Sequence, residues 1–596
     1  MRQPRILLLR ALPLSIVLLM GLMGRAHAQG CTTCVPLDDL SGPVYRGRAP
    51  GLYAAGLNVP PPAHAALALS QAALVVPRDA AGAASANGRI GFLAIGMSNA
   101  NQEFSAFERL EDARIGRNPR VVVVGCAFGG QSADVIVNPA APYWTTVSQR
   151  VSAAGLSAAQ VQVLWLKDAE GAMPDSSFPA HADTLRSHLR SIVRALRGRY
   201  PNLRLAYLSS RTYGGWNSAV NVGEPVSYET AFAVRDLIAE QTSGSAALNA
   251  DPAAGAVQAP VLLWGPYLWA RGNTPRASDG LTWPIAFVET DHVHPSMPGE
   301  ARVAQLLADF LLHESTAAAW RDRSPGETSM ALDAVADAWV DDLQPTVNHG
   351  TDTTLAWVNA SARSYIRFDL SSVTAPVFHA KLSLRNLPDP TTSAVQVARS
   401  SNTVWTETGI TAASAPAFDL GTVGTIPQAS RGTAISLDVT AAVVAALASG
   451  PGAGLTLGLR ATSGPVVTQF VRARETGEGP RLVLSLAGGT VGVGSGAVTA
   501  VPRLRAQGSP FGRDLPLWLE SPMTARVELL IFDPQGRRVR RLLDEVMPSG
   551  AHRLVWDALD DAGRPVVPGL YLARAVLQPE QGRTQYAVAK LIRLAP

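Results

Sequence analysis

Five short apolar runs, alternating with helical patterns between residues 89 and 315, constrain the fold of this chain more than any other feature. The runs are RIGFLAIG, RVVVVGCA, VQVLWLKD, LRLAYLSS and PVLLWGPY. The helical patterns are NQEFSAFERLEDAR, HADTLRSHLRSIVRALRGRY, SYETAFAVRDLIAEQ and PGEARVAQLLADFLLHE. Continuously apolar strands that alternate with helices are typical of a parallel sheet covered on both faces. We therefore predict a three-layer α/β domain over residues 89–320.

The pattern changes after about residue 325, where β-prone runs alternate with Gly, Pro, Ser and Thr. One short helical pattern, AISLDVTAAVVAALASG, interrupts these runs. This texture is typical of antiparallel sandwiches, and it predicts two all-β sandwich domains, at residues 331–487 and 505–596. The Gly-rich stretch between them, residues 488–504, is predicted to be a linker.

The N-terminus predicts export. Three arginines precede the apolar stretch ALPLSIVLLMGLMG, which is followed by AHA at residues 26–28. A basic start, a short apolar core and an A-x-A site are typical of a secretory signal peptide, here residues 1–28. A membrane anchor is the alternative, although the core is short for a span. We expect a periplasmic, secreted or cell-surface protein with no membrane span in the mature chain. Residues 29–88 are expected to be a lead-in segment that wraps the first domain.

The cysteines and the charge limit other functions. Cys31 and Cys34 form the only close cysteine pair, and export permits a disulfide between them. A redox site is the alternative for this pair, but it lacks a strand–helix setting. Cys126 follows a run of valines and is expected to be a buried thiol. The net charge is only +4, without a Lys/Arg block, so the composition gives no support for nucleic-acid binding.

A serine, an aspartate and a histidine form the candidate catalytic set. Ser98 stands where the first apolar run meets its helix, at the edge of the sheet where open α/β folds bind ligands. Asp291 and His294 lie three residues apart before the last helical pattern. A serine nucleophile needs a histidine base that a carboxylate orients. We predict these roles for the three residues; the alternatives are a helix N-cap for Ser98 and His292 as the base.

The motifs GMSN and DHVHPS, at residues 96–99 and 291–296, resemble the first and last blocks of the SGNH (GDSL-like) hydrolase superfamily. The G-x-S-N form resembles the carbohydrate acetylesterase branch, and no G-x-S-x-G motif surrounds the serine. The resemblance implies a flavodoxin-like α/β fold and serine chemistry that needs no cofactor.

The same resemblance implies an oxyanion hole. Its donors would be the backbone N–H groups of Ser98 and of Gly130, with Gly129 as the alternative to the second. The third block departs from the family pattern, because LWLKDAEG places Lys167 and Asp168 where an asparagine or a QGE-like segment is expected. Lys167 is the candidate third donor.

Aromatic residues near two strand ends are candidates for binding a sugar ring. Arg211, Tyr213 and Trp216 follow one strand, and Trp269 follows another together with Trp264 and Tyr267. Core packing is the alternative for all of these aromatic residues. A catalytic metal held by Asp291, His292, His294 and Asp168 is a further alternative. The spacings typical of zinc sites are missing from the sequence, so we predict no metal.

The two β regions resemble known modules. Residues 331–487 resemble the DNRLRE-type module, some of whose members bind carbohydrate. The matching pieces are Asn348–Gly350, YIRFDL at 365–370, WTE at 405–407 and DVT at 438–440. A plain spacer is the alternative. Residues 505–596 resemble the FlgD-type immunoglobulin-like domain, a structural or surface-attachment module, with Trp556 and Tyr571 as expected core residues.

Together these features predict an exported serine esterase that removes O-acyl groups, such as acetyl, from a polysaccharide. Its partner would be an acylated polysaccharide or a small ester, with attachment to the cell surface as an option. The alternative from another class is a surface carbohydrate-binding or adhesion protein whose α/β domain has lost catalysis. A lipase or thioesterase of the same superfamily is a second enzymatic alternative.

Overall fold

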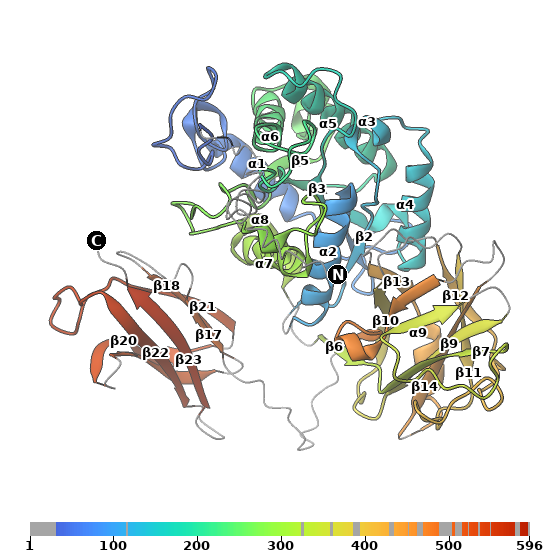
Figure 1. Cartoon of the computed structure of the whole chain (residues 1–596). Helices are drawn as coiled ribbons and strands as arrows, with labels where there is room; N and C mark the ends of the chain where they lie inside the picture. Colours follow the sequence, from blue (N-terminus) through green and yellow to red (C-terminus); the bar gives the residue numbers. More distant parts are fainter. Residues whose placement is uncertain are drawn as a thin grey trace, which may run out of the picture. The chain divides into compact units, whose positions relative to one another are not determined.

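The structure of the chain is a computed structural model (Figure 1). It divides into two compact units, residues 1–490 and 491–596. The predicted signal peptide and most of the predicted linker lie outside the described residues. The structure describes residues 31, 33–114, 117–322, 327–357, 361–385, 394–427, 434–450, 452–461, 469–487, 503–506, 515–521, 524–533, 537–548, 550–578 and 585–593.

The first unit begins with a five-stranded sheet in the order β2-β1-β3-β4-β5. Every neighbouring pair is parallel, and all five predicted apolar runs form its strands. The strands are β1 (Ile90–Gly96), β2 (Val121–Gly125), β3 (Val161–Lys167), β4 (Leu205–Leu208) and β5 (Val261–Trp264). Each strand residue is buried, as expected for a sheet with helices on both faces.

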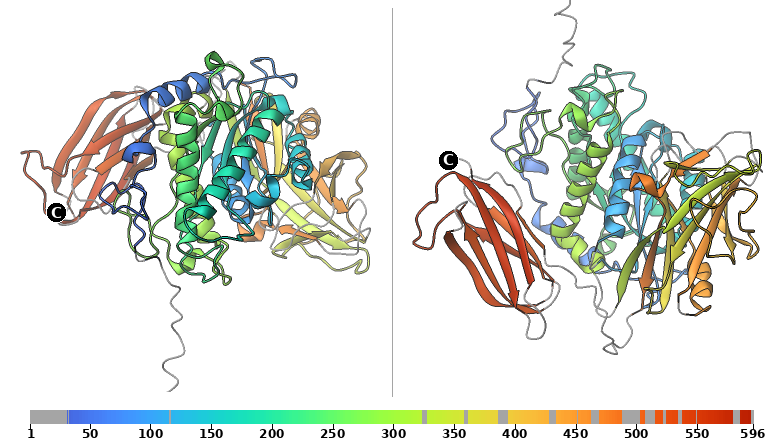
Figure 2. Two further views of the ribbon diagram at one scale, coloured as in Figure 1. Left: turned by 90° about the horizontal axis from the view of Figure 1, so that it is seen from above. Right: turned by 60° about the horizontal axis from the view of Figure 1, so that its bottom comes forward.

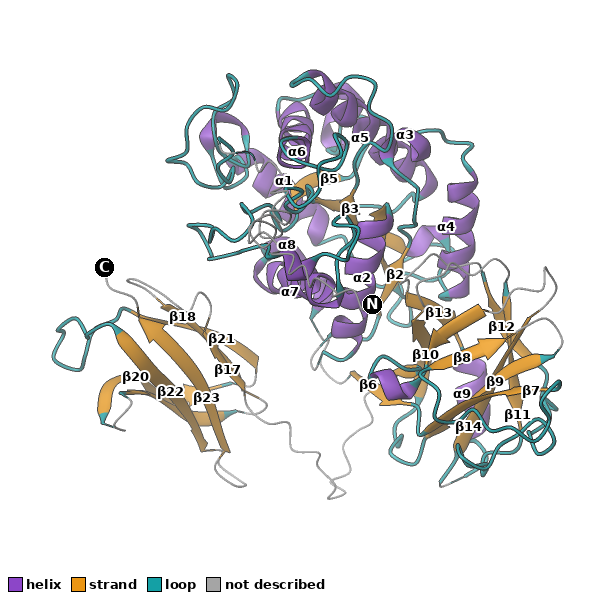
Figure 3. Ribbon diagram, viewed as in Figure 1, coloured by secondary structure: helices purple, strands orange, loops and turns teal. Residues whose placement is uncertain are grey.

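Helices cover both faces of this sheet, so the predicted α/β region with a parallel sheet is confirmed (Figure 3). Successive β1 residues point to opposite faces. Phe92 packs in a core with α1, α2, α7 and α8, whereas Leu93 packs in a second core with α3, α4, α5 and α6. The helices are α1 (Pro62–Ala72), α2 (Ser98–Asp112), α3 (Ala133–Ile136), α4 (Pro142–Ala153), α5 (Ala180–Arg199), α6 (Val226–Thr242), α7 (Met297–His313) and α8 (Ser315–Arg321).

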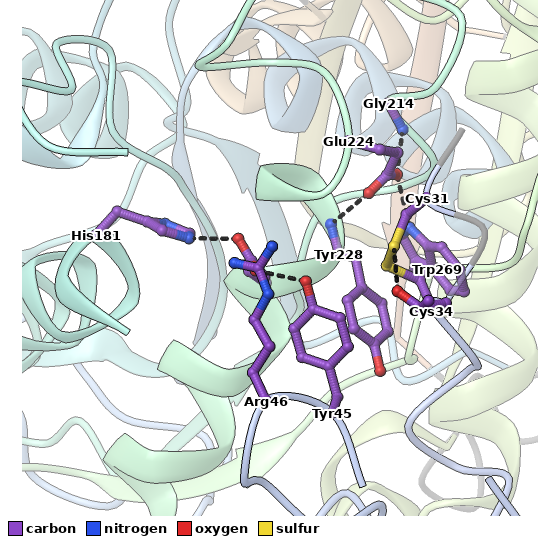
Figure 4. The surroundings of a disulfide bond; sticks show 11 residues. Cys31, Cys34, Tyr45, Arg46, His181, Gly214, Glu224, Tyr228 and Trp269 are labelled. Carbon is purple, nitrogen blue, oxygen red and sulfur yellow. Dashed lines mark hydrogen bonds and ion pairs between the residues drawn. A yellow bond between two sulfur atoms is a disulfide. The ribbon is translucent and has the colours of Figure 1, made fainter. Parts of the chain in front are cut away.

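The described part of the lead-in segment, residues 29–88, packs on the α/β region through a buried polar network. The Tyr45 hydroxyl donates to Glu229 at 2.6 Å, and His181 Nε2 lies 2.7 Å from the same carboxylate. Arg46 lies 3.1 Å from it. Figure 4 shows Tyr45, Arg46 and His181 converging on this point. The segment is therefore fixed to helix α6 by the ion pairs and hydrogen bonds of Glu229.

The cysteines take the states that the sequence predicts. Cys31 and Cys34 form a disulfide at the start of the lead-in segment (Figure 4). Cys126 is free and buried at the end of β2. Burial raises the pKa of the Cys126 thiol to about 12, so this thiol is uncharged at neutral pH and serves as a packing residue.

The β-rich part of the first unit holds antiparallel sheets, as predicted. Their strand orders are β13-β10-β16-β6, β12-β11-β14-β9-β7 and β15-β8. The strands are β6 (Thr328–Asp333), β7 (Ala336–Asp341), β8 (Thr354–Trp357), β9 (Ala362–Asp369), β10 (Val377–Arg385), β11 (Val395–Ser400), β12 (Thr422–Ile426), β13 (Ala434–Asp438), β14 (Gly454–Ala461), β15 (Gln469–Arg472) and β16 (Arg481–Leu486). Helix α9 (Thr440–Leu447) lies in the one predicted helical pattern. We call residues 328–486 the sandwich.

The sandwich is docked on helix α2 through buried charges. Lys381 Nζ of β10 lies 2.8 Å from Glu108 Oε1 and 2.8 Å from Asp112 Oδ2. The Ser436 hydroxyl of β13 donates to the same Glu108 oxygen at 2.8 Å. Strand β13 contacts α2 here, and Figure 2 shows orange strands of the sandwich beside the blue helix of the α/β region. The α/β region and the sandwich thus share an interface that separate, merely tethered modules would lack.

The second unit consists of antiparallel sheets in the orders β17-β18-β21 and β20-β19-β22-β23. The strands are β17 (Arg503–Ala506), β18 (Leu515–Ser521), β19 (Ala525–Phe532), β20 (Arg538–Met547), β21 (Gly550–Trp556), β22 (Gly569–Gln578) and β23 (Gln585–Arg593). Trp556 and Tyr571 are buried in its core with their rings 5.2 Å apart, as expected from the sequence. Strand β17 begins at Arg503, so the last two residues of the predicted linker, 503 and 504, belong to a strand.

Candidate active site

Ser98, His294 and Asp291 form one hydrogen-bonded chain. His294 Nε2 lies 2.9 Å from Ser98 Oγ, and His294 Nδ1 lies 2.6 Å from Asp291 Oδ2. Ser98 is the first residue of α2, and the N-cap position belongs to Met97, which makes no side-chain cap bond. The helix-cap alternative for Ser98 is therefore wrong. The hydroxyl, imidazole and carboxylate therefore follow one another in the order that a serine hydrolase mechanism requires.

The loop before α7 positions the histidine. Asp291 Oδ1 accepts from the backbone N–H groups of Val293, at 2.9 Å, and His294, at 3.0 Å. The Asn99 side-chain amide, next to the serine in α2, donates to the Val293 carbonyl at 2.8 Å. This last bond joins the histidine loop to the helix that carries Ser98, so the spacing between nucleophile and base is held from both sides.

Asp291 is charged over the whole physiological pH range. Partial burial acts to raise its pKa, but the hydrogen bonds from the His294 side chain and from the His294 and Val293 amides lower the pKa to about 2. A permanently ionised carboxylate on Nδ1 keeps that nitrogen protonated and leaves Nε2 free to accept a proton.

His292, the rival base, is exposed and has φ of +57°. This left-handed conformation is uncommon for a residue other than glycine. The His292 amide donates to the Glu289 carbonyl at 2.9 Å, which closes a tight turn. His292 thus forms the bend that brings His294 back to Asp291, and its ring is directed into solvent.

The two predicted glycines lie at the same edge of the sheet as Ser98. Gly129 and Gly130 follow β2, which pairs with β1 in parallel, and both are exposed. Gly130 has φ of +72°, with nothing within 4 Å of the position that a Cβ would take. The loop is therefore open at Gly130, where a backbone N–H can face a substrate.

The structure differs from the expectation for Lys167. Its ammonium lies 2.6 Å from both carboxylate oxygens of Glu103, and both side chains are buried. A buried ammonium is stable only with a counterion, and Glu103 of α2 supplies it. The Lys167 side chain links β3 to α2 through this ion pair, so its ammonium is not a free donor to a ligand at the sheet edge.

Asp168, the next residue, has an oxygen that no described group satisfies. Its Oδ1 accepts from the Ala169 amide at 2.9 Å, and its buried Oδ2 has no hydrogen-bond partner among the described residues. Burial raises the pKa of the Asp168 carboxyl well above its ordinary value. Asp168 lines a pocket with Met97 and Asn99, the two neighbours of Ser98 in the chain. The Asp168 carboxyl is thus buried, with a raised pKa, in a pocket that also touches the start of α2.

The predicted substrate-binding residues divide into two groups. Arg211 lines the pocket of Asp168, and Tyr213 lines a neighbouring pocket with Trp283. Tyr213 and Trp216 are partly exposed and pack edge to face at 5.6 Å. Trp269 is completely buried, and its indole N–H donates to Glu224 at 2.8 Å (Figure 4). The prediction of sugar stacking is therefore wrong for Trp269, because a buried indole cannot reach a ligand.

The alternative metal set is not assembled. Among the residues that the structure describes, one group of three His, Cys, Asp or Glu side chains has ligand atoms within 4.8 Å of one another. That group is Asp337, Glu407 and Glu475, in the sandwich. Asp291, His292, His294 and Asp168 do not form such a group.

Comparison with protein families identifies the sandwich as the part with a known counterpart. Residues 328–486 match the model of carbohydrate-binding module family 96. No curated protein matches the chain. Within the described residues no helix is long and apolar enough to cross a membrane. The chain thus contains a region similar to a carbohydrate-binding module behind an α/β region.

Solved structures give only distant likenesses. A carbohydrate esterase family 3 protein from Talaromyces cellulolyticus is 12% identical, over 37% of this chain and 96% of its own, with a TM-score of 0.23. Bacteroides uniformis beta-glucuronidase 3 is 13% identical, over 42% and 28%, with a TM-score of 0.17. PorZ of Porphyromonas gingivalis is 17% identical, over 19% and 14%, with a TM-score of 0.12. At these TM-scores none carries an argument about this chain.

Proposed function

We propose that the α/β region is an SGNH-type serine esterase that removes O-acyl groups, acetyl in the first place, from a polysaccharide. The single observation that carries this proposal is the chain of hydrogen bonds from Ser98 through His294 to Asp291. The match of residues 328–486 to a carbohydrate-binding module supports a polysaccharide substrate. That region would be the DNRLRE-type module and would hold the polymer near the serine.

In this mechanism Ser98 Oγ attacks the acyl carbonyl while His294 Nε2 takes the hydroxyl proton. Asp291 stabilises the imidazolium that forms. The C–O bond to the sugar then breaks, and His294 returns its proton to the departing sugar oxygen. A water molecule then attacks the acyl-serine while His294 takes its proton. The C–O bond to Ser98 breaks, His294 returns the proton to Ser98 Oγ, and the carboxylic acid leaves. The chain's own side chains supply every proton transfer, so the reaction needs no cofactor.

Three donors would stabilise the oxyanion. Two are the backbone N–H groups of Ser98 and Gly130, both at the carboxyl edge of the sheet. The third would be Asp168, because a neutral carboxylic acid in a buried site can donate a hydrogen bond at neutral pH. This assignment replaces Lys167, whose ammonium is bound to Glu103.

Two substitutions of Asp168 test that role. We expect Asp168→Asn to keep kcat within a few-fold, because an amide donates as the acid does. Asp168→Leu should lower kcat by about 100-fold, the typical cost of one lost oxyanion donor. Wild-type activity should also fall as the pH rises through the raised pKa of Asp168, and Asp168→Asn should lack that fall. Equal kcat values in the two variants would show that Asp168 is not a donor of the oxyanion hole.

Export belongs to the same proposal. Residues 1–28 would be removed as a signal peptide, and the Cys31–Cys34 disulfide suits an oxidising compartment. The second unit would be the FlgD-type immunoglobulin-like domain and would attach the protein to the cell surface. A second candidate function is a surface carbohydrate-binding or adhesion protein with an inactive α/β region. The observation favouring it is that the family match covers only the sandwich.

A direct assay separates the two candidates. The mature chain should release p-nitrophenol from p-nitrophenyl acetate, more slowly from the butyrate, and acetate from acetylated xylan. A fluorophosphonate probe, which reacts with activated serines, should modify one peptide, the one that contains Ser98. Absence of both hydrolysis and labelling would favour the binding protein, and labelling of another serine would contradict the proposed site.

A further inference from the structure

Three carboxylates of the sandwich lie close together, and none of them has a role in the proposed ester hydrolysis. Asp337 lies on β7, Glu407 in the loop between β11 and β12, and Glu475 in the short 3₁₀ helix Arg474–Thr476. One oxygen of each lies within 4.8 Å of the others. Asp337 is 1% exposed, Glu407 is partly exposed, and Glu475 is an exposed residue whose side chain is 26% exposed. The group is therefore buried at one end and open to solvent at the other.

The hydrogen bonds within the group leave one oxygen unsatisfied. Asp337 Oδ2 accepts from the Arg474 amide at 3.0 Å, and the Asp337 amide donates to Glu407 Oε1 at 3.1 Å. Asp337 Oδ1 is buried and has no hydrogen-bond partner among the described residues. Buried oxygens of this kind are rare in folded proteins and costly without a partner. An additional positive group at this position would remove the cost.

The charges of the group do not balance. The Arg474 guanidinium lies 2.7 Å from Glu407 Oε2 and 3.7 Å from Glu475 Oε1. One cation thus faces three carboxylates, which leaves two negative charges in excess when all three are ionised. A divalent cation supplies the missing charge, and the open side at Glu475 gives it a path from solvent.

The chemical type of the ligand atoms indicates which cation the group would bind. All three ligands are carboxylate oxygens, which hard cations prefer, whereas zinc sites are built mainly from cysteine and histidine. Calcium takes six to eight oxygens at about 2.3–2.6 Å, so oxygens on opposite sides of one ion stand up to about 5 Å apart. The three carboxylate oxygens fit within one such coordination sphere, with water or backbone carbonyls completing it.

We propose that Asp337, Glu407 and Glu475 bind one calcium ion. The ion would join strand β7, the loop after β11 and the 3₁₀ helix, which are separated by about 70 residues at each step in the chain. The loop at Glu407 is already tied to the turn at Asn348, whose amide donates to the Glu407 carbonyl at 2.8 Å. Calcium would therefore stabilise this end of the sandwich, independently of any catalysis in the α/β region.

The test is calorimetric unfolding of the full chain after treatment with EDTA. Calcium at about 1 mM should raise the Tm of the sandwich transition by about 5 °C in a saturable manner, and magnesium should do so less. Asp337→Asn should abolish the calcium response while the protein stays folded, because an amide at this site removes a negative charge. Asp369→Asn, an exposed acidic residue at the end of β9, should keep the full response.

Terbium luminescence gives a second readout. Terbium, which replaces calcium in oxygen sites, should bind the wild type with a stoichiometry of one, be displaced by calcium and fail to bind Asp337→Asn at the same concentration. An unchanged wild-type Tm in calcium, or equal responses of the wild type and Asp337→Asn, would overturn the proposal. Neither readout depends on esterase activity, so failure of the proposed function would leave this result unaffected.

Discussion

His294→Ala should lower kcat for p-nitrophenyl acetate by about 1,000-fold or more, since a serine hydroxyl without its base is a poor nucleophile. His294 is the only ring placed between Ser98 Oγ and Asp291 in the described structure, at 2.9 Å and 2.6 Å. Removing it breaks both hydrogen bonds at once. The measurement is steady-state hydrolysis by purified, folded protein, with Ser98→Ala defining the residual rate.

His292→Ala is the matched control, because it removes a histidine two residues away in the same loop. The His292 side chain is exposed, and its structural contribution is a left-handed turn that alanine also disfavours. We therefore expect a loss of about tenfold or less, caused by a less well-ordered loop. A large loss of kcat in His292→Ala together with a small loss in His294→Ala would contradict the assignment of His294 as the base and of Asp291 as its partner.

The fold of the α/β region was largely predictable from the sequence, because its strands are apolar along their whole length. A strand buried on both faces leaves a continuous signal, and all five such runs form β1 to β5. Helix α4 was not predicted. Its sequence, PYWTTVSQRVSA, is rich in polar and β-branched residues, and it is helical because Tyr143, Trp144 and Val147 pack on the sheet. Tertiary packing here overrides a weak local preference.

The pairing of Asp291 with His294 was predictable for a local reason, whereas the surroundings of the proposed site were not. Asp291 and His294 are three residues apart, so one turn brings them together. The partners of Lys167 and Trp269, by contrast, are Glu103 and Glu224, at separations of 64 and 45 residues. Such long-range pairs have no counterpart in local spacing, and this is why a donor role for Lys167 and a sugar-stacking role for Trp269 were plausible from the sequence alone.

The docking of the sandwich on the α/β region could not be predicted from the sequence either. Lys381 and Glu108 are 273 residues apart, and each looks like an ordinary charged residue of a surface. In the structure both are buried, together with Asp112. Burial alone would raise the Asp112 pKa, but Lys381 and Arg117 lower it below its ordinary value. Asp112 is therefore favoured in its ionised form beside Lys381 and Arg117.

Lys381→Met should destabilise the first unit by about 3–5 kcal/mol, the usual cost of removing one partner from a buried ion pair. Methionine fills most of the lysine volume but leaves Glu108 without its cation and Asp112 with Arg117 alone. Urea unfolding of the full chain, followed by tryptophan fluorescence, measures the change. Both the α/β region and the sandwich should lose unfolding free energy, since the ion pair joins them.

Arg481→Met is the control, because it breaks an ion pair in the same sandwich whose acidic partner, Asp333, is 67% exposed. Exposed pairs contribute about 0–1 kcal/mol, so this variant should unfold within about 1 kcal/mol of the wild type. Adding Glu108→Gln to Lys381→Met should restore part of the lost stability, because it removes the uncompensated charge. A loss below 1 kcal/mol for Lys381→Met, equal to the control, would mean that the two regions are not held together by this cluster and fold independently.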